Sequence, residues 1–222
     1  MNSLTRRAAA VLVLGSCLSV PALAADAPRV KFATSAGDIV VEVYPDKAPK
    51  TVENFLQYVK DKHYDGVIFH RVIDNFMIQT GGFDASMVEK KTRPAVAHEG
   101  RTALTNGLRN QTGYLAMART NDPNSASAQF FINLKDNAFL DPTLIPPGDP
   151  VPRFEYGGQV YTDVPRARLE SAPQLFGYTV FGKVVSGMDV VNKIRAVPTG
   201  TQGGHGDVPK TPVVITSATI VK

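Results

Sequence analysis

Residues 69–82 read FHRVIDNFMIQTGG, and this stretch decides the fold. Short runs of β-branched and aromatic residues alternate in it with turn residues, and it ends at a Gly-Gly pair, a pattern typical of β-strands. Successive side chains of a strand point to opposite faces. We therefore expect Arg71, Phe76 or Met77, and Gln79 to bring polar and apolar groups together on one surface patch.

The same rhythm continues on both sides of this stretch. Upstream, 30–34 and 38–44 alternate apolar and polar residues around a Ser-Ala-Gly connection, which predicts an antiparallel hairpin. Further short strands are predicted at 67–73, 76–79, 114–118, 130–134, 179–185 and 213–221. Many short strands between turns indicate a closed barrel or a sandwich.

Two segments have helical periodicity. In 51–59, which follows Pro49, apolar residues recur at spacings of three and four, and 187–194 carries a second, shorter apolar stripe. The predicted fold class is therefore all-β with two helices.

A proline-rich stretch, 142–176, interrupts the strand pattern, with a small hairpin predicted at 154–161. Long loops are usually either functional or flexible linkers. Two interpretations stay open here, an elaborated surface loop and a spacer, and its role is left unassigned.

The first 24 residues have the pattern of a cleavable signal peptide. Arg6 and Arg7 precede an apolar run at 8–20, and Ala22-Leu23-Ala24 is a small-x-small cleavage site. This predicts export to the periplasm. Alternatives are a membrane anchor, for which the run is short, a lipid-anchored form through Cys17, and export by the twin-arginine route rather than the general one.

Composition constrains the remaining chain, 26–222, which we expect to form one domain. Cys17 is the only cysteine, so disulfides do not stabilise the exported form. Loss of Arg6 and Arg7 lowers Lys+Arg from 24 to 22 against 20 acids, a net charge of +2. This balance argues against nucleic acid as a partner. The mature chain has no second apolar run of spanning length, so no membrane span is expected.

Motifs for nucleophilic or metal chemistry are missing from the sequence. It contains no Gly-x-Ser-x-Gly and no His-Glu-x-x-His, and its four histidines lie far apart. We expect neither a metal nor a cofactor.

Three further segments complete the pattern of 69–82: GYLAMAR at 113–119, AQFFIN at 128–133 and GYTVFGKV at 177–184. In order and spacing they resemble the signature segments of cyclophilins. The resemblance covers nearly all of 26–222. It implies an eight-stranded closed antiparallel β-barrel with two capping helices and a peptide groove outside the barrel.

The resemblance also implies roles for individual residues. Arg71 would be catalytic, and the proline pocket would consist of Phe76, Met77, Phe131 and Leu140. Gln79 and Gln129 would orient substrate carbonyls, and the backbone of Ala118, Arg119 and Thr120 would pair with a substrate strand. Tyr178 and Phe139 stand where many cyclophilins have histidine and tryptophan, so cyclosporin binding is not implied. Taken singly, each residue also fits an ordinary structural role, such as a solvated charge for Arg71.

The implied function is peptidyl-prolyl cis/trans isomerisation, with assistance to the folding of exported proteins. The expected partners are proline-containing unfolded or partly folded polypeptides, and a monomer is expected. The competing hypothesis is a non-catalytic chaperone module that binds proline-containing segments. A structural role of 142–176 is a third.

Overall fold

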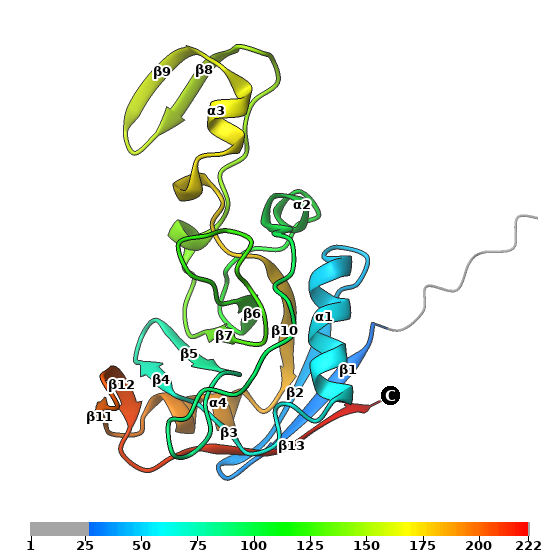
Figure 1. Ribbon diagram of the computed structural model, residues 1–222, viewed down its shortest axis with the longest axis vertical. Helices are drawn as coiled ribbons and strands as arrows, with labels where there is room; N and C mark the ends of the chain where they lie inside the picture. The colour runs from blue at the N-terminus through cyan, green and yellow to red at the C-terminus, as the bar shows by residue number, and fades with distance from the viewer. Residues whose placement is uncertain (1–26, 222) are drawn as a thin grey trace, which may run out of the picture.

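The computed structural model describes residues 27–221, and its main feature is a nine-stranded antiparallel sheet that curls strongly on itself (Figure 1). In sheet order the strands are β3 (Val67–Ile68), β13 (Val214–Val221), β1 (Arg29–Thr34), β2 (Gly37–Val43), β10 (Val180–Ser186), β6 (Tyr114–Met117), β7 (Phe130–Asn133), β5 (Met77–Thr80) and β4 (Arg71–Ile73). The predicted strands are all present, and the β-rich fold class is confirmed.

The two end strands of the sheet, β3 and β4, are consecutive parts of one chain segment. β3 pairs with β13 and β4 pairs with β5. Between them, the amide of Phe69 donates to Val213 at 2.9 Å and that of His70 donates to Gln79 at 3.1 Å. Counted as one strand, this segment gives the eight strands expected. Regular strand geometry is interrupted at residues 69–70, however, so the sheet does not close through a continuous ladder.

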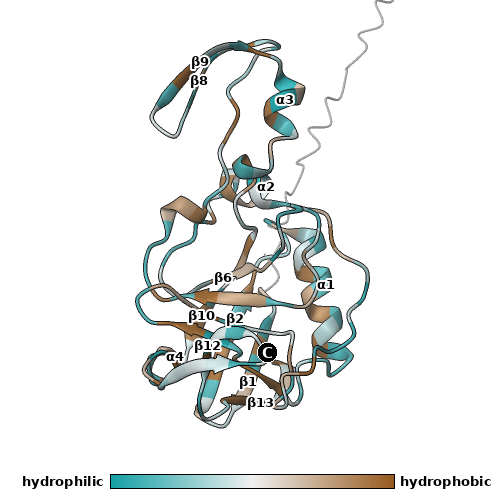
Figure 2. Cartoon of the chain, turned by 60° about the vertical axis from the view of Figure 1, so that its left-hand side comes forward, coloured by the Kyte–Doolittle hydropathy of each residue, from teal (hydrophilic) through white to brown (hydrophobic). Residues whose placement is uncertain are grey.

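The inner face of the curled sheet is filled by aromatic rings. Phe55 lies 5.1 Å from Phe181 and 5.6 Å from Phe130 between ring centroids, and Phe32 and Tyr64 extend the cluster. All five side chains are buried. Hydrophobic residues are accordingly concentrated on the sheet strands in Figure 2. A filled interior leaves no room for a ligand, so a binding site must lie outside the sheet.

Both predicted helices are present. Helix α1 (Pro49–Lys60) begins at a proline and buries Val52, Phe55 and Val59, while α4 (Met188–Arg195) buries Val190, Val191 and Ile194. The prediction of two helices is incomplete, because α2 (Gly100–Thr105) and α3 (Arg166–Glu170) are also helical. Each is shorter than two turns, too short to show an apolar period.

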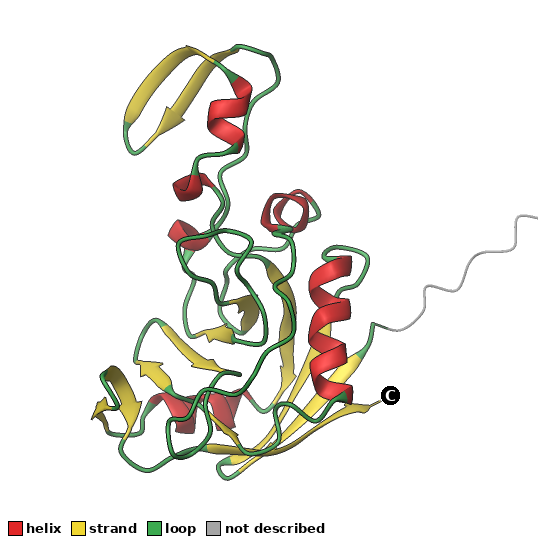
Figure 3. Cartoon of the chain, viewed as in Figure 1, coloured by secondary structure: helices red, strands yellow, loops and turns green. Residues whose placement is uncertain are grey.

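Residues 142–176, here called the lobe, carry their own secondary structure (Figure 3). Strands β8 (Val151–Tyr156) and β9 (Gln159–Val164) form an antiparallel hairpin, longer than the one predicted at 154–161. Helix α3 and the 3₁₀ helix η2 (Pro173–Leu175) follow. The lobe projects away from the curled sheet in Figure 1.

A second small hairpin lies beside β4. Strands β11 (Thr199–Gln202) and β12 (His205–Pro209) are joined at Gly203-Gly204, both with positive φ. These two strands were not predicted from the sequence. Among residues 27–221, no helix is long and apolar enough to cross a membrane. The predicted signal segment, 1–24, lies outside the described residues.

Candidate active site

Strand register places three of the predicted site residues, Arg71, Gln79 and Phe131, in one row. Arg71 on β4 is opposite Gln79 on β5, Gln79 is opposite Phe131 on β7, and Phe131 is opposite Ala116 on β6. Directly opposed side chains lie on the same face, ~5 Å apart at Cβ. The adjacent row, with Ile78 and Ile132, is buried in the interior. The row of Arg71 therefore faces outward.

A pocket of ≈ 170 Å³ opens beside this row. Nine predicted residues line it: Arg71, Phe76, Met77, Gln79, Ala118, Arg119, Phe131, Leu140 and Tyr178. Thr120 and Gln129 line an adjoining pocket of ≈ 220 Å³, which shares Gln79, Ala118 and Arg119 with the first. Segments up to about a hundred residues apart in sequence thus meet at one surface site.

Phe139 is the one predicted residue outside these pockets. Its side chain is 73% exposed and stacks on Phe76, with ring centroids 5.9 Å apart. It stands on the 3₁₀ helix η1 (Ala138–Leu140), whose last residue, Leu140, lines the first pocket. Phe139 therefore extends the apolar wall of the pocket outward.

The apolar floor of the pocket is fixed by packing. Met77, Phe131 and Leu140 are each 9% exposed or less. Tyr178 meets Phe131 edge to face at 5.5 Å, and the Arg119 guanidinium lies 4.9 Å from the centre of the Tyr178 ring. Arg119 Nε also donates to the carbonyl of Gly177 at 2.9 Å. The floor is therefore preformed and suits a small apolar ring.

Two amides form the polar edge. Gln79 Nε2 donates to Gln129 Oε1 at 2.9 Å, which holds both side chains in place. A side chain at Gly82 would exclude this arrangement, because a Cβ atom there would lie 2.5 Å from Gln129 Nε2. Each amide keeps a carbonyl or N–H group with which to bind a peptide.

The backbone at 118–120 is partly engaged within the chain. The amide of Ala118 donates to the Gln129 carbonyl at 2.9 Å, and that of Thr120 donates to Ser125 Oγ at 2.9 Å. A substrate strand would therefore use carbonyl oxygens of this segment more than these two N–H groups.

Arg71 is one of two arginines that line the pocket, the other being Arg119. The side chain of Arg71 is 45% exposed, and its Nε lies 4.0 Å from Asp207 Oδ2 on β12. An exposed ion pair of this length is weak, worth ~0–1 kcal/mol, so the guanidinium can turn toward a ligand. Asp207 was missed by sequence reasoning, because only the packing of β12 on β4 brings it near Arg71.

His70 precedes Arg71, is 4% exposed, and lines a pocket together with Arg71, Gln79 and Gln129. Burial, and secondarily the nearby His205, lowers the pKa of His70 to about 4. Its ring centroid lies 4.8 Å from that of Phe83. The imidazole is therefore neutral at pH 7 and adds no charge beside Arg71.

Asn137 is a positioning residue that sequence reasoning also missed. It is fully buried, and its Nδ2 donates to the Phe76 carbonyl at 3.0 Å and to Asn133 Oδ1 at 2.8 Å. These bonds join the start of η1 to the turn that carries Phe76. They set the distance between Leu140 and the rest of the pocket.

Among residues 27–221, no three His, Cys, Asp or Glu side chains gather in a group that could hold a metal ion.

Comparison with known proteins identifies the family. A family model described as cyclophilin type peptidyl-prolyl cis-trans isomerase/CLD matches residues 29–220. The chain is 50% identical over 192 residues to peptidyl-prolyl cis-trans isomerase cyp18 of Streptomyces antibioticus, covering 86% of this chain and 98% of that one. It is 46% identical over 191 residues to peptidyl-prolyl cis-trans isomerase B of Escherichia coli, with the same coverage. Against isomerase A of Dickeya dadantii it is 44% identical over 216 residues, covering 97% and 96%.

Solved structures agree on the fold. A cyclophilin type isomerase from Cryptosporidium parvum superposes with a TM-score of 0.58 at 22% identity, covering 88% of this chain and 98% of that one. The same protein solved in the presence of the dipeptide Ala-Pro gives 0.57, covering 87% and 99%. With the family model and the bacterial relatives, these matches place the chain in the cyclophilin family, and it is a peptidyl-prolyl cis-trans isomerase.

Proposed function

We propose that isomerisation takes place at the pocket beside Arg71, with the substrate proline ring on the floor of Met77, Phe131 and Leu140. The observation that carries this assignment is the cross-strand row that sets Arg71 next to Gln79 and Phe131. It puts one directional cation at the edge of a preformed apolar pocket. The Cryptosporidium relative solved with Ala-Pro supports a proline-containing ligand.

Arg71 would act on the twisted amide. Resonance in the peptide bond opposes rotation with a barrier of about 18–20 kcal/mol. As the bond twists, the prolyl nitrogen loses conjugation with the carbonyl. Its lone pair becomes localised on the nitrogen, and a guanidinium N–H can donate a hydrogen bond to it. That hydrogen bond exists only in the twisted state, so it lowers the barrier rather than stabilising the substrate.

The hydrogen bond from Arg71 alone does not account for the whole lowering of the rotation barrier. A preorganised donor contributes roughly 3–4 kcal/mol by comparison with oxyanion holes. The remainder would come from the pocket, which excludes water from the prolyl ring and holds it partly twisted. Gln79 and Gln129 would hold the flanking carbonyls, and no proton needs to be transferred.

For biological setting, we propose that the protein acts in the periplasm on proline-containing segments of exported polypeptides. The support is the signal-like pattern of 1–24, with its Arg6-Arg7 start and Ala-Leu-Ala cleavage site. Isomerases A and B of Dickeya and Escherichia are bacterial relatives. Every residue proposed for the site belongs to one chain, so a monomer suffices.

The test compares wild-type protein with Arg71→Ala on an Ala-Pro tetrapeptide, using exchange NMR for the isomerisation rate and a titration for Kd. We expect wild-type protein to accelerate exchange, and the variant to bind the peptide but lose most of the acceleration. If a folded wild-type protein binds without acceleration, the site is a holding module. If the variant keeps full acceleration, the chemistry lies elsewhere.

A further inference from the structure

The lobe has an apolar core of its own. Val151, Phe154, Leu169 and Leu175 are each 7% exposed or less and form a cluster separate from that of the curled sheet. A flexible spacer would not bury such side chains, because ordering a loop costs conformational entropy that only stabilising contacts offset. The lobe is therefore a folded unit with defined surfaces.

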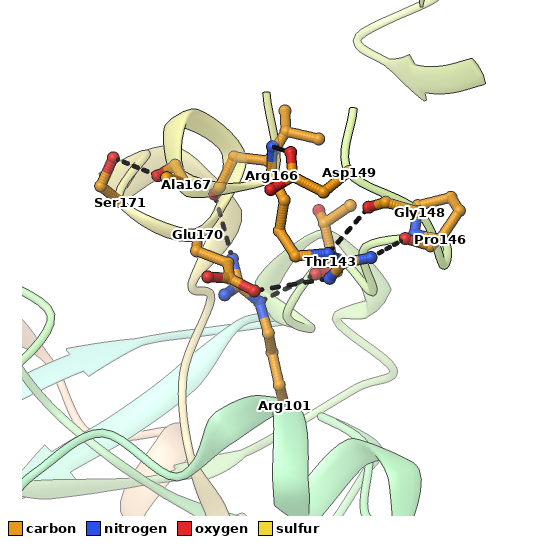
Figure 4. Close-up of polar contacts among 10 residues, drawn as sticks. Arg101, Thr143, Pro146, Gly148, Asp149, Arg166, Ala167, Glu170 and Ser171 are labelled. Atoms are coloured by element: carbon orange, nitrogen blue, oxygen red, sulfur yellow. Dashed lines mark hydrogen bonds and ion pairs between the residues drawn. The ribbon is translucent and has the colours of Figure 1, made fainter. Parts of the chain in front are cut away.

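Two arginines make polar contacts to backbone carbonyls of the lobe (Figure 4). Arg101, on α2, donates to the carbonyls of Thr143 at 3.2 Å and Leu169 at 3.5 Å, and its guanidinium lies 4.8 Å from the centre of the Phe176 ring. Arg166 donates to the carbonyls of Gly148, at 2.9 Å, and Pro146. The Arg101 contacts reach from the body of the protein into the lobe and hold the two in a definite relation, whereas the Arg166 contacts lie within the lobe.

Pockets continue from the proposed catalytic site onto the lobe. The catalytic pocket shares Arg119 and Tyr178 with a broad pocket of ≈ 620 Å³, which also involves Gln174 of the lobe. Gln174 in turn lines a third pocket of ≈ 180 Å³ on the lobe itself. Phe154, Tyr156, Tyr161, Leu169 and Leu175 are among the residues that line this third pocket. Shared lining residues thus connect all three.

The third pocket has the chemistry of a peptide-binding surface. Tyr156 and Tyr161 are 37% and 42% exposed, and Arg168 is the one charged residue in its lining. Tyrosine offers an apolar ring with a hydrogen-bonding hydroxyl and loses little entropy when it is ordered, which makes it frequent at interfaces. Such a surface suits an extended segment with apolar or aromatic side chains.

We propose that the lobe pocket is a second binding site for the same unfolded polypeptide whose X-Pro bond occupies the pocket beside Arg71. This inference rests on the proposed function for the position of the proline. A long substrate fills both sites, and a tetrapeptide fills only the first. Binding at one site raises the effective concentration of the chain at the other, so long substrates bind more tightly.

The test uses Tyr161→Ser, with Val160→Ser as matched control. Val160 is the preceding residue of β9, is 52% exposed and does not line the pocket, because neighbouring strand residues point to opposite faces. Two substrates are compared, an Ala-Pro tetrapeptide and a long, permanently unfolded, proline-containing polypeptide. Kd comes from fluorescence anisotropy and the rate from exchange NMR.

We expect Tyr161→Ser to weaken binding of the long polypeptide about tenfold, equivalent to ~1.4 kcal/mol, without changing tetrapeptide turnover. Val160→Ser should change neither. Equal affinities of all three proteins for the long polypeptide would overturn the proposal, and so would equal losses in the two variants. Absence of tetrapeptide turnover in the wild type would instead contradict the proposed function, and the Tyr161 effect on binding would still be measurable.

A second measurement does not depend on how the variants fold. Amide resonances of the wild-type protein are followed while each substrate is added. The long polypeptide should shift residues beside Tyr156, Tyr161 and Gln174, and the tetrapeptide should leave them unchanged. Shifts confined to the surroundings of Arg71 would contradict a second site. Lobe shifts that appear on raising the protein concentration alone would assign the surface to a second copy of the chain.

Discussion

Arg71 and His70 are adjacent in the chain but differ in exposure and in charge. Arg71 points outward and keeps its charge in water, whereas His70 is 4% exposed and, through burial, has its pKa lowered to about 4. The ring of Phe83, 4.8 Å from that of His70, contributes to the burial of His70. Of the two arginines that line the pocket, Arg119 donates to the carbonyls of Gly177 and Thr120, whereas Arg71 makes a long ion pair with Asp207 and is the freer to bind a substrate.

The buried His70 makes stability depend on pH. Between pH 6.5 and about 4 the unfolded chain binds a proton at this residue and the folded chain does not, so the free energy of unfolding should fall as pH is lowered through that window. At ~1.36 kcal/mol per pKa unit, the loss is up to about 3 kcal/mol, and above pH 6.5 this contribution is constant. Urea denaturation at a series of pH values measures it.

His70→Gln provides the comparison for this prediction. The variant should show a smaller decrease in the free energy of unfolding between pH 6.5 and 4. Part of the decrease should persist, because burial also lowers the pKa of His98 to about 4. Parallel pH profiles for variant and wild type would rule out His70 as a source of acid sensitivity.

At the level of elements, the site depends on how η1 is joined to the strands. Leu140 and Phe139 stand on η1, which has only three residues, so its own hydrogen bonds do not hold it in place. The buried bonds of Asn137 to the Phe76 carbonyl and to Asn133 fix it instead. A polar network in the core thus positions an apolar pocket.

Asn137→Ala should lower the free energy of unfolding by ~1–3 kcal/mol, because buried partners lose their hydrogen bonds. It should also lower kcat/KM on a tetrapeptide, since Leu140 and Phe76 are no longer held together. Asn192→Ala, at an exposed position on α4, is the control and should stay within about 0.5 kcal/mol of wild type. Equal stability of Asn137→Ala and wild type would show that η1 is held by packing alone.

Elements with a strong local period could be predicted from the sequence. The hairpin of β1 and β2 and helix α1 are present where alternation and the spacing of Val52, Phe55 and Val59 placed them. Helix α2 and strands β11 and β12 were missed, because each has at most six residues and no clear period.

The sequence predicted which residues line the site better than it predicted the contacts that hold them. The resemblance named the pocket residues, but nothing local placed Asp207 beside Arg71, or Asn137 beside the Phe76 carbonyl 61 residues away. Partners of this kind depend on the register of strands and on loops that meet only in the folded chain.

At the scale of the molecule, the lobe leaves and returns through a narrow base. The amide of Thr143 donates to Leu175 and that of Tyr178 donates to Leu140, both at 2.9 Å. Gly177, with φ +59°, permits this approach, because a Cβ atom there would lie 2.5 Å from the Pro142 nitrogen. All residues that line the proposed catalytic pocket lie outside the lobe.

Replacing residues 144–174 with a short glycine linker should therefore leave tetrapeptide turnover close to that of the wild type. The linker has only to join Thr143 and Leu175, whose backbones already pair. Turnover is measured by exchange NMR, with circular dichroism to establish that the protein is folded. Loss of turnover in a folded protein would mean that the lobe supports the catalytic pocket itself.

In the proposed mechanism, the direction of the Arg71 guanidinium, and not merely its charge, stabilises the twisted prolyl bond. The most direct measurement compares wild type, Arg71→Lys and Arg71→Ala for kcat/KM and Kd on one tetrapeptide. A lysine keeps the charge but lacks the planar fork. We predict that both variants lose roughly 10²–10³-fold in kcat/KM, as when an oxyanion-hole donor is removed, while Kd changes little. Recovery of most of the activity by Arg71→Lys, or a fall in activity matched by weaker binding, would contradict this mechanism.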